Sequence, residues 1–143
     1  MDMYARLGEE LKRLFQKEHL LIGDEGGYML DFAHNEEPLA ILDKLREQRI
    51  PHAFLALDAA ASEFFENGSY VFEGKPISSQ DLQKVYEGYF QKHASLVSIE
   101  DPFEEHDRAG FQSMQKANLD RIVVGDDLTT TNPESIERAA EEG

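Results

Sequence analysis

The sequence contains no cysteine, and only 14 of its 143 residues are lysine or arginine. Without cysteine, disulfide bonds and thiolate metal sites are excluded, and a cytoplasmic location fits this composition. The 29 aspartates and glutamates leave a formal net charge of −15, which argues against nucleic-acid binding because contacts to phosphate need a basic face. No segment approaches the roughly 20 apolar residues of a membrane span. We therefore expect neither nucleic acid nor a membrane as a partner.

Short apolar runs alternate with helical patterns along the chain. The runs are each long enough for one buried strand, and they span residues 20–22, 54–57, 96–99 and 122–124. Apolar spacing and capping residues predict helices over residues 3–17, after a possible Asn35 cap, after Ser78 or Ser79, around 111–117 and after Asn132. Alternation of this kind predicts βα units and a parallel sheet. We expect one α/β domain over residues 1–143, a parallel (βα)4 unit equal to half of a (β/α)8 barrel.

One insertion interrupts this alternation. Asn67-Gly68, a dipeptide typical of two-residue hairpin turns, separates the segments 63–66 and 69–73. We expect a small antiparallel β-hairpin there, inserted after the strand 54–57. A parallel sheet of four strands also leaves two open edges, so we expect a homo-oligomer in which copies of the chain pair these edges.

Acidic residues follow all four expected strands. Asp58, Glu100 and Asp126 are each the first acid after a strand, and parallel strands bring their carboxyl ends to one edge of a sheet. Three carboxylates without histidine or cysteine offer only oxygen ligands, which a hard cation such as Mg²⁺ prefers. We predict that these three residues bind one Mg²⁺. The alternative for each of them is a solvated rim residue or a helix N-cap.

Glu25 follows the first expected strand and stands in a glycine-rich turn, with Gly23 before it and Gly26-Gly27 after it. Such a loop lets the backbone come close to a ligand. Other carboxylates nearby would favour the protonated form of Glu25, which makes this residue a candidate general acid. An ordinary glycine-rich turn without a catalytic role is the alternative.

Four stretches of the sequence together resemble the enolase family. They are Gly23-Asp24-Glu25-Gly26-Gly27-Tyr28, Leu57-Asp58-Ala59-Ala60-Ala61-Ser62-Glu63-Phe64, Ser98-Ile99-Glu100-Asp101-Pro102-Phe103 and Val124-Gly125-Asp126-Asp127-Leu128-Thr129-Thr130-Thr131-Asn132-Pro133. They follow one another in the order, and at nearly the spacing, of consecutive enolase motifs. The resemblance covers nearly all of this chain but only part of an enolase. It implies a fragment of the catalytic barrel domain, an enolase-type TIM barrel.

The resemblance also implies an activity, the Mg²⁺-dependent interconversion of 2-phosphoglycerate and phosphoenolpyruvate in glycolysis, which is a lyase reaction. It implies that Asp58, Glu100 and Asp126 hold the Mg²⁺ that chelates the substrate carboxylate. Glu100 and Asp126 would therefore also bind the substrate. Glu25 would be the acid that helps the 3-hydroxyl of 2-phosphoglycerate leave as water.

The sequence departs from the enolase pattern in two places. The lysine base of the family is expected beyond Gly143, and none of the lysines of this chain follows an expected strand. The segment Met29-Leu30-Asp31 stands where the family has a proline after the Gly-Gly-aromatic run.

Two interpretations remain open. The first is an enolase fragment that keeps the metal ligands and the acid. The second is a truncated, catalytically inactive enolase-like half-barrel that binds metal or a partner. A third, an unrelated acidic domain of phosphotransferase type, would need a lysine after a later strand, and the sequence has none there.

Overall fold

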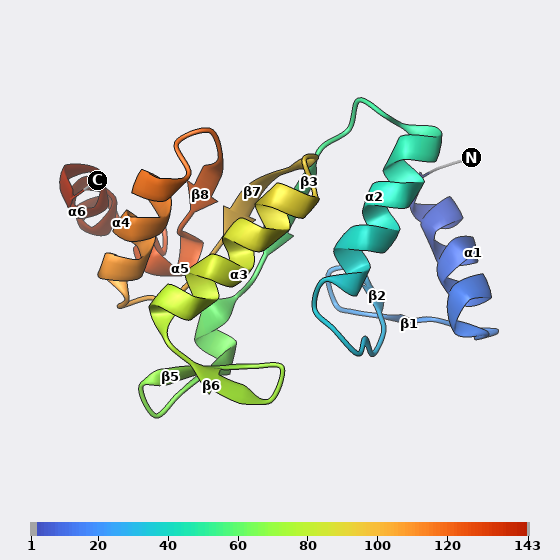
Figure 1. Ribbon diagram of the computed structural model, residues 1–143, viewed down its shortest axis with the longest axis horizontal. Helices are drawn as coiled ribbons and strands as arrows, with labels where there is room; N and C mark the ends of the chain where they lie inside the picture. The colour runs from blue at the N-terminus through green and yellow to red at the C-terminus, as the bar shows by residue number, and fades with distance from the viewer. Residues whose placement is uncertain (1–2, 143) are drawn as a thin grey trace. The chain divides into compact units, whose positions relative to one another are not determined.

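The computed structural model describes residues 3–142. Contacts within the chain divide it into two compact units, Met1–Pro51 and His52–Gly143 (Figure 1). Each unit has its own buried apolar residues, Leu11, Leu39 and Leu45 in the first and a larger set in the second. That residues 1–143 form a single domain stays a prediction.

In the first unit, α1 (Met3–Phe15) and α2 (Glu37–Arg49) are the two helices that the sequence predicts there. Pro38 lies in the first turn of α2 as expected, where its missing N–H leaves no helical hydrogen bond unmade. The prediction that Asn35 caps this helix was wrong, because the N-cap is Glu36. The backbone already forms a turn before the helix, in which the Glu37 N–H donates to the His34 carbonyl at 3.1 Å.

The first expected strand has a different partner from the one predicted. β1 (Leu21–Ile22) pairs antiparallel with β2 (Tyr28–Met29) instead of joining a parallel sheet. The chain reverses between them in the glycine-rich turn, where the φ of Gly26 is +86° and the Gly23 N–H donates to the Gly27 carbonyl at 2.8 Å. The apolar pattern predicts that a strand exists but does not identify its partner.

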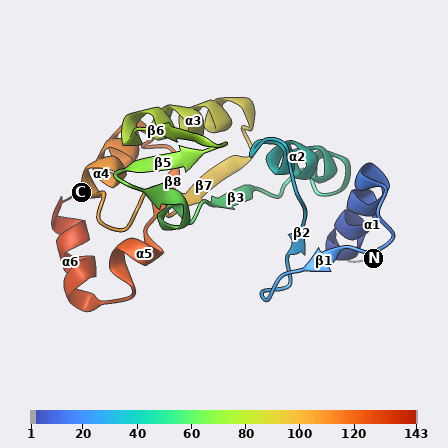
Figure 2. The same ribbon diagram turned by 90° about the horizontal axis from the view of Figure 1, so that it is seen from below.

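The second unit contains a parallel sheet with the strand order β3-β7-β8. Its strands are β3 (Leu55–Asp58), β7 (Leu96–Glu100) and β8 (Ile122–Val124), and they match three of the four expected strands. The helices α3 (Ser79–Lys92) and α4 (Arg108–Ala117) lie together on one side of this sheet (Figures 1 and 2). The predicted α/β class with a parallel sheet is confirmed, with three parallel strands instead of the expected four, and the sheet does not close into a barrel within residues 3–142.

The two faces of this sheet differ. Paired residues of parallel strands point to the same face, and successive residues alternate between faces. Leu57, Ile99 and Val123 are paired in register and share the face that carries buried Ile99. The core on that side also includes the buried side chains Leu82, Tyr86, Phe90, Leu96, Phe103, Phe111 and Met114. The opposite face carries Asp58 and Glu100, which are paired with each other.

The predicted hairpin is present and has one more strand than expected. β4 (Phe65–Glu66), β5 (Ser69–Phe72) and β6 (Lys75–Ile77) form an antiparallel sheet, which we call the ribbon. Asn67 and Gly68 both have positive φ, 51° and 81°, as a type I′ turn requires. Residues 63 and 64, expected in the first strand, lie instead in a 3₁₀ helix, η1 (Ala61–Phe64).

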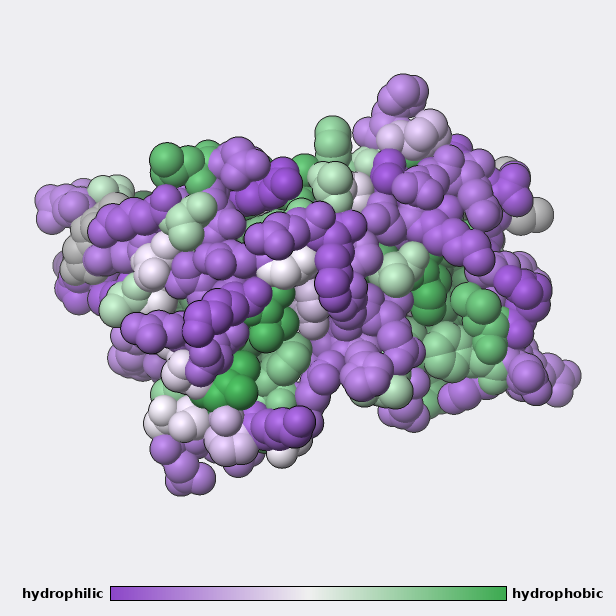
Figure 3. Space-filling model, viewed as in Figure 1, coloured by the Kyte–Doolittle hydropathy of each residue, from purple (hydrophilic) through white to green (hydrophobic). Residues whose placement is uncertain are grey.

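Two helices follow the parallel sheet. α5 (Asp126–Thr129) is a single turn that the sequence did not predict, and α6 (Pro133–Glu142) is the predicted last helix. The Asn132 side chain caps α6 as expected, because its Oδ1 accepts the N–H of Glu134 at 2.9 Å. Among residues 3–142, no helix combines the length and the apolar character that crossing a membrane requires. Hydrophilic residues cover much of the face shown in Figure 3, as the net charge of −15 predicts.

Candidate functional site

The three predicted metal ligands all lie at the carboxyl edge of the parallel sheet. Asp58 is paired with Glu100, and Glu100 is paired with Val124. Asp126 follows Val124 by two residues and is the first residue of α5. All three acids therefore lie at one end of the sheet, as the sequence predicts for the ends of parallel strands.

The charges at this edge repel one another. Burial, and after it the negative charges of Asp58, Asp101, Asp126 and Asp127, raise the pKa of Glu100. A carboxylate in such surroundings is stabilised by a cation, which removes the repulsion between like charges. The electrostatics of the edge therefore favour a bound cation.

The small residues after Asp58 allow the ends of two strands to approach each other. Ala61 is fully buried, and its N–H donates to the Asp101 carbonyl at 3.0 Å. The N–H of Ala59 donates to the Glu100 carbonyl at 2.9 Å. These bonds extend the pairing of β3 and β7 past their formal ends and fix the backbone directly after Asp58.

Asp101 follows Glu100 directly and has a different environment. Its side chain is buried, and both of its carboxylate oxygens accept the N–H of Asp127, each at 3.2 Å. Burial raises the pKa of Asp101, while the N–H of Asp127 lowers it in part. The carboxylate of Asp101 therefore bonds to the backbone of α5.

Glu25 belongs to the first unit and is exposed, on the turn between β1 and β2. Tyr4 holds this turn against α1, because its hydroxyl donates to the Gly26 carbonyl at 2.6 Å. The ring of Tyr4 also stacks on that of Tyr28, with centroids 4.5 Å apart. The role of Glu25 beside the acids of the second unit stays a prediction.

A second acidic group, which the sequence analysis did not single out, lies in the loop after β7. Among the described residues, Glu104, Glu105 and His106 are the one set of three histidines or acids whose ligand atoms all lie within 4.8 Å of one another. The hydrogen bond between His106 Nδ1 and Glu104, 2.8 Å long, raises the pKa of His106. The sequence signal that could have indicated this group is that its three residues are consecutive. The ligand atoms of Asp58, Glu100 and Asp126 do not all lie within 4.8 Å of one another.

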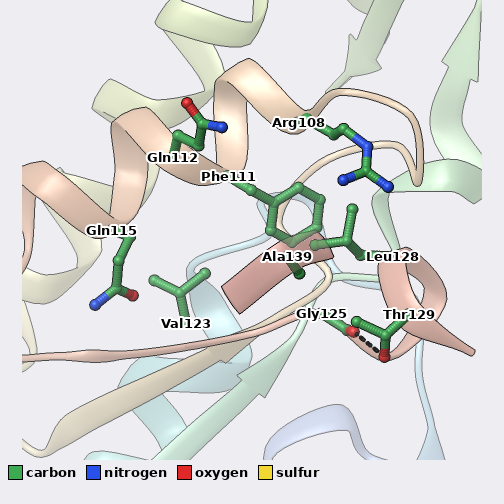
Figure 4. Close-up of a pocket in the computed structure, with 9 residues that line it drawn as sticks. All are labelled: Arg108, Phe111, Gln112, Gln115, Val123, Gly125, Leu128, Thr129 and Ala139. Atoms are coloured by element: carbon green, nitrogen blue, oxygen red, sulfur yellow. Dashed lines mark hydrogen bonds between the residues drawn. The ribbon is translucent and has the colours of Figure 1, made fainter. Parts of the chain in front are cut away.

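A pocket of about 200 Å³ lies in the same unit, between α4, β8, α5 and α6 (Figure 4). Phe111, Val123, Leu128 and Ala139 supply its apolar lining. Val123 is paired with Ile99, so the pocket lies on the face of β8 opposite to that of Glu100. It is separate from the acidic edge.

The lysines of the chain lie away from the ends of the parallel strands. Among residues 3–142, none follows β3, β7 or β8 directly. Lys75 begins β6 of the ribbon, Lys17 follows α1, and the others lie on helices: Lys12, Lys44, Lys84, Lys92 and Lys116. The acidic edge therefore has no lysine at a position typical of a catalytic base in a barrel.

Comparison with known proteins gives consistent matches along the whole chain. Residues 1–143 match the family described as Enolase, C-terminal TIM barrel domain. The enolase of Elusimicrobium minutum is 43% identical over 122 residues, which cover 84% of this chain and 29% of that protein. Enolase 1 of Lactococcus lactis subsp. cremoris is 35% identical over 152 residues, which cover 100% of this chain and 36% of that protein. The enolase of Aeropyrum pernix is 34% identical over 145 residues, which cover 98% of this chain and 33% of that protein.

Proposed function

Because this chain belongs to the enolase family, as part of its C-terminal TIM barrel domain, we propose that it contributes the magnesium ligands and the acid of a cytoplasmic enolase. The chain spans about a third of the length of the relatives that it matches. The proposed reaction is the glycolytic interconversion of 2-phosphoglycerate and phosphoenolpyruvate, which a lyase of the phosphopyruvate hydratase type catalyses. The observation that carries this proposal is the strand register, which pairs Asp58 with Glu100 and Glu100 with Val124, two residues before Asp126.

The residues at the edge fit a magnesium ion. Asp58, Glu100 and Asp126 offer carboxylate oxygens only, which suit Mg²⁺. The mutual repulsion that raises the pKa of Glu100 would fall when a cation binds. Bound Mg²⁺ would supply positive charge that stabilises the substrate carboxylate. Glu100 and Asp126 would orient the substrate at this edge.

Glu25 has the chemistry of the acid. Dehydration of 2-phosphoglycerate breaks the C–O bond at carbon 3, and the hydroxyl leaves as water once it has received a proton. Glu25 would supply this proton, from a turn whose glycines permit close approach of a ligand. The proton on carbon 2 must pass to a base, and no lysine among the described residues stands at the end of a parallel strand.

A second candidate function is a catalytically inactive, enolase-like half-barrel that binds metal or a partner. The placement of the lysines favours it for the chain alone. Since loss of a base that works with the rest of a site costs several orders of magnitude in rate, we expect little or no dehydration of 2-phosphoglycerate by the purified chain. Turnover that disappears in Glu25→Ala would contradict this expectation and favour the first function for the chain by itself.

Calorimetric titration with Mg²⁺ tests the metal centre. We expect modest affinity in the unaltered chain, because substrate oxygens that complete the octahedron are absent. Asp126→Ala should bind Mg²⁺ at least about tenfold more weakly, as loss of a ligand should cost no less than loss of an outer-shell partner. Asp120→Ala is the matched control, since the side chain of Asp120 is largely exposed and lies outside the acidic edge. Equal affinity in Asp126→Ala and the unaltered chain would refute the assignment.

We also propose that copies of the chain associate through the open edges of the parallel sheet. Within the described residues, β3 and β8 each pair only with β7, and Phe54 and Ile122 are 70% and 59% exposed. Pairing β8 of one copy with β3 of another would satisfy their free N–H and C=O groups. Sedimentation equilibrium at micromolar concentration should show a dimer or a larger species. A single species of monomer mass would contradict this.

A further inference from the structure

The buried carboxylate of Asp101 accepts a backbone hydrogen bond from the first turn of α5. Asp101 is 4% exposed, and a buried charged group costs free energy unless hydrogen bonds compensate it. Both of its oxygens accept the same donor, the N–H of Asp127. That donor is in the first turn of α5, directly after Asp126. Asp101 therefore bonds to the residue next to a predicted metal ligand.

The local sequence explains why α5 depends on a residue from another strand. The N-cap of α5 is Gly125, which has no side chain to accept a hydrogen bond. A Cβ atom at this position would lie 2.9 Å from Cβ and 3.0 Å from Cδ2 of Leu128, so the usual capping residues would collide with the helix that they cap. Asp101 supplies the missing acceptor from the end of β7.

The backbone of Asp101 connects the ends of all three parallel strands. Its N–H donates to the Val124 carbonyl at 2.9 Å, and its carbonyl accepts the N–H of Ala61 at 3.0 Å. These bonds join the end of β7 to the end of β8 and to the segment after β3. Asp101 has a φ of 40°, a left-handed conformation that aspartate, asparagine and glycine adopt more readily than other residues.

We propose that Asp101 is a positioning residue for the magnesium centre, which holds Asp126 in place through the N–H of Asp127. The inference rests on the proposed function, because it takes Asp126 as a metal ligand. Asp101 itself is not a ligand in this assignment, since both of its oxygens face the backbone of α5. Asp101 would affect Mg²⁺ affinity only by fixing the position of Asp126.

Two substitutions at residue 101 separate position from charge. Asp101→Asn keeps one oxygen acceptor, tolerates the left-handed backbone and removes the charge. Asp101→Gly also tolerates that backbone but removes the acceptor as well. We expect calorimetric Mg²⁺ affinity within about threefold of the unaltered chain for Asp101→Asn, and a 10- to 100-fold loss, typical of an outer-shell partner, for Asp101→Gly. Equal losses in the two variants would mean that charge alone acts and would overturn the proposal.

A matched control separates a general loss of stability from an effect on the ion. Asp107 also accepts an N–H in the first turn of a helix, α4, where it is the N-cap and bonds the N–H of Gly110 at 3.0 Å, but it is not among the charges that affect Glu100. We expect Asp107→Gly to lower the resistance to urea and to leave Mg²⁺ affinity unchanged. A loss of affinity in Asp107→Gly as large as in Asp101→Gly would overturn the proposal.

Amide hydrogen exchange tests the contact without any substitution. We expect the N–H of Asp127 to exchange slowly in the unaltered chain, and faster in Asp101→Gly. Exchange of this N–H at the rate of an open loop would overturn the inference even if Asp101→Gly does not fold. If the unaltered chain does not bind Mg²⁺, both the metal centre and the positioning role are overturned. If it binds Mg²⁺ and Asp101→Gly binds it equally well, only the positioning role is overturned.

Discussion

Removing the hydroxyl from each of two buried tyrosines should destabilise the second unit in one case and not in the other. Tyr70 and Tyr86 are 1% and 2% exposed, and burial raises the pKa of both. The Tyr70 hydroxyl donates to Asp107 Oδ2 at 2.8 Å and accepts the N–H of Glu104 at 3.0 Å. Among the described residues, the Tyr86 hydroxyl is the buried side-chain group without a hydrogen-bond partner.

The two substitutions to phenylalanine therefore differ in what they break. Tyr70→Phe removes a hydrogen bond to a charged group, which contributes about 1.5–3 kcal/mol, and leaves the Glu104 N–H without its acceptor, at a cost of about 1–3 kcal/mol if water does not replace it. Since this region is part-buried, we expect a net loss of about 3 kcal/mol. Tyr86→Phe removes an unpaired polar group from the core and should be neutral or stabilise the fold by about 1 kcal/mol.

Urea denaturation followed by circular dichroism measures both effects. In thermal unfolding followed by the same signal, about 3 kcal/mol corresponds, for a unit of this size, to a fall in the melting temperature of roughly 12 °C or more. The two variants keep both aromatic rings, so packing is matched and only the hydroxyls differ. If Tyr86→Phe destabilises the fold as much as Tyr70→Phe, the reasoning from hydrogen-bond partners is refuted.

Two further predictions concern one pair of glycines and the acidic edge. Gly110→Ala should destabilise the fold by about 1–3 kcal/mol, because the added Cβ would lie 2.9 Å from Phe103 Cγ, whereas Gly88→Ala, with nothing within 4 Å, should stabilise α3 by about 0.5–1 kcal/mol. Comparable changes of the same sign in urea midpoints would contradict this. Glu100→Gln should be more stable than the unaltered chain at pH 7 without Mg²⁺. The pKa of Glu100 is higher in the folded chain than its ordinary value of 4.5. Glu100 therefore contributes most to stability at pH values below 4.5, and this contribution is lost as the pH rises through the folded pKa. The difference between the two chains should therefore shrink as the pH falls, and a constant difference would contradict the assignment.

The sequence predicts the parallel sheet well because the signals for it are local. Three apolar runs flanked by helical patterns became β3, β7 and β8, and Asn67-Gly68 became the expected hairpin turn. The extra strand β6 follows the turn Glu73-Gly74, in which a glutamate has a φ of 48°. Glutamate is rare in that conformation, so the sequence gives little signal for this turn.

The candidate site could be predicted in part for the same reason. Acids directly after parallel strands reach one edge whatever the rest of the fold does, and Asp58 and Glu100 are accordingly paired. The burial of Asp101 could not be predicted, because it depends on β8 and α5, which lie more than 20 residues further along the chain. Whether Glu25 meets these acids depends on contacts between two units, which no local pattern encodes.

The ribbon has a consequence for local unfolding. It is inserted between β3 and α3, yet the hydroxyl of Tyr70, on β5, binds the backbone of Glu104 and the side chain of Asp107. The Ser62 side chain, just before the ribbon, also accepts the N–H of Glu105 at 3.3 Å. The ribbon and the loop after β7 therefore share their hydrogen bonds, and neither can open without exposing those of the other. We therefore expect the ribbon and this loop to open together as one cooperative unit, so that changes in the ribbon alter how readily the loop beside the acidic edge opens.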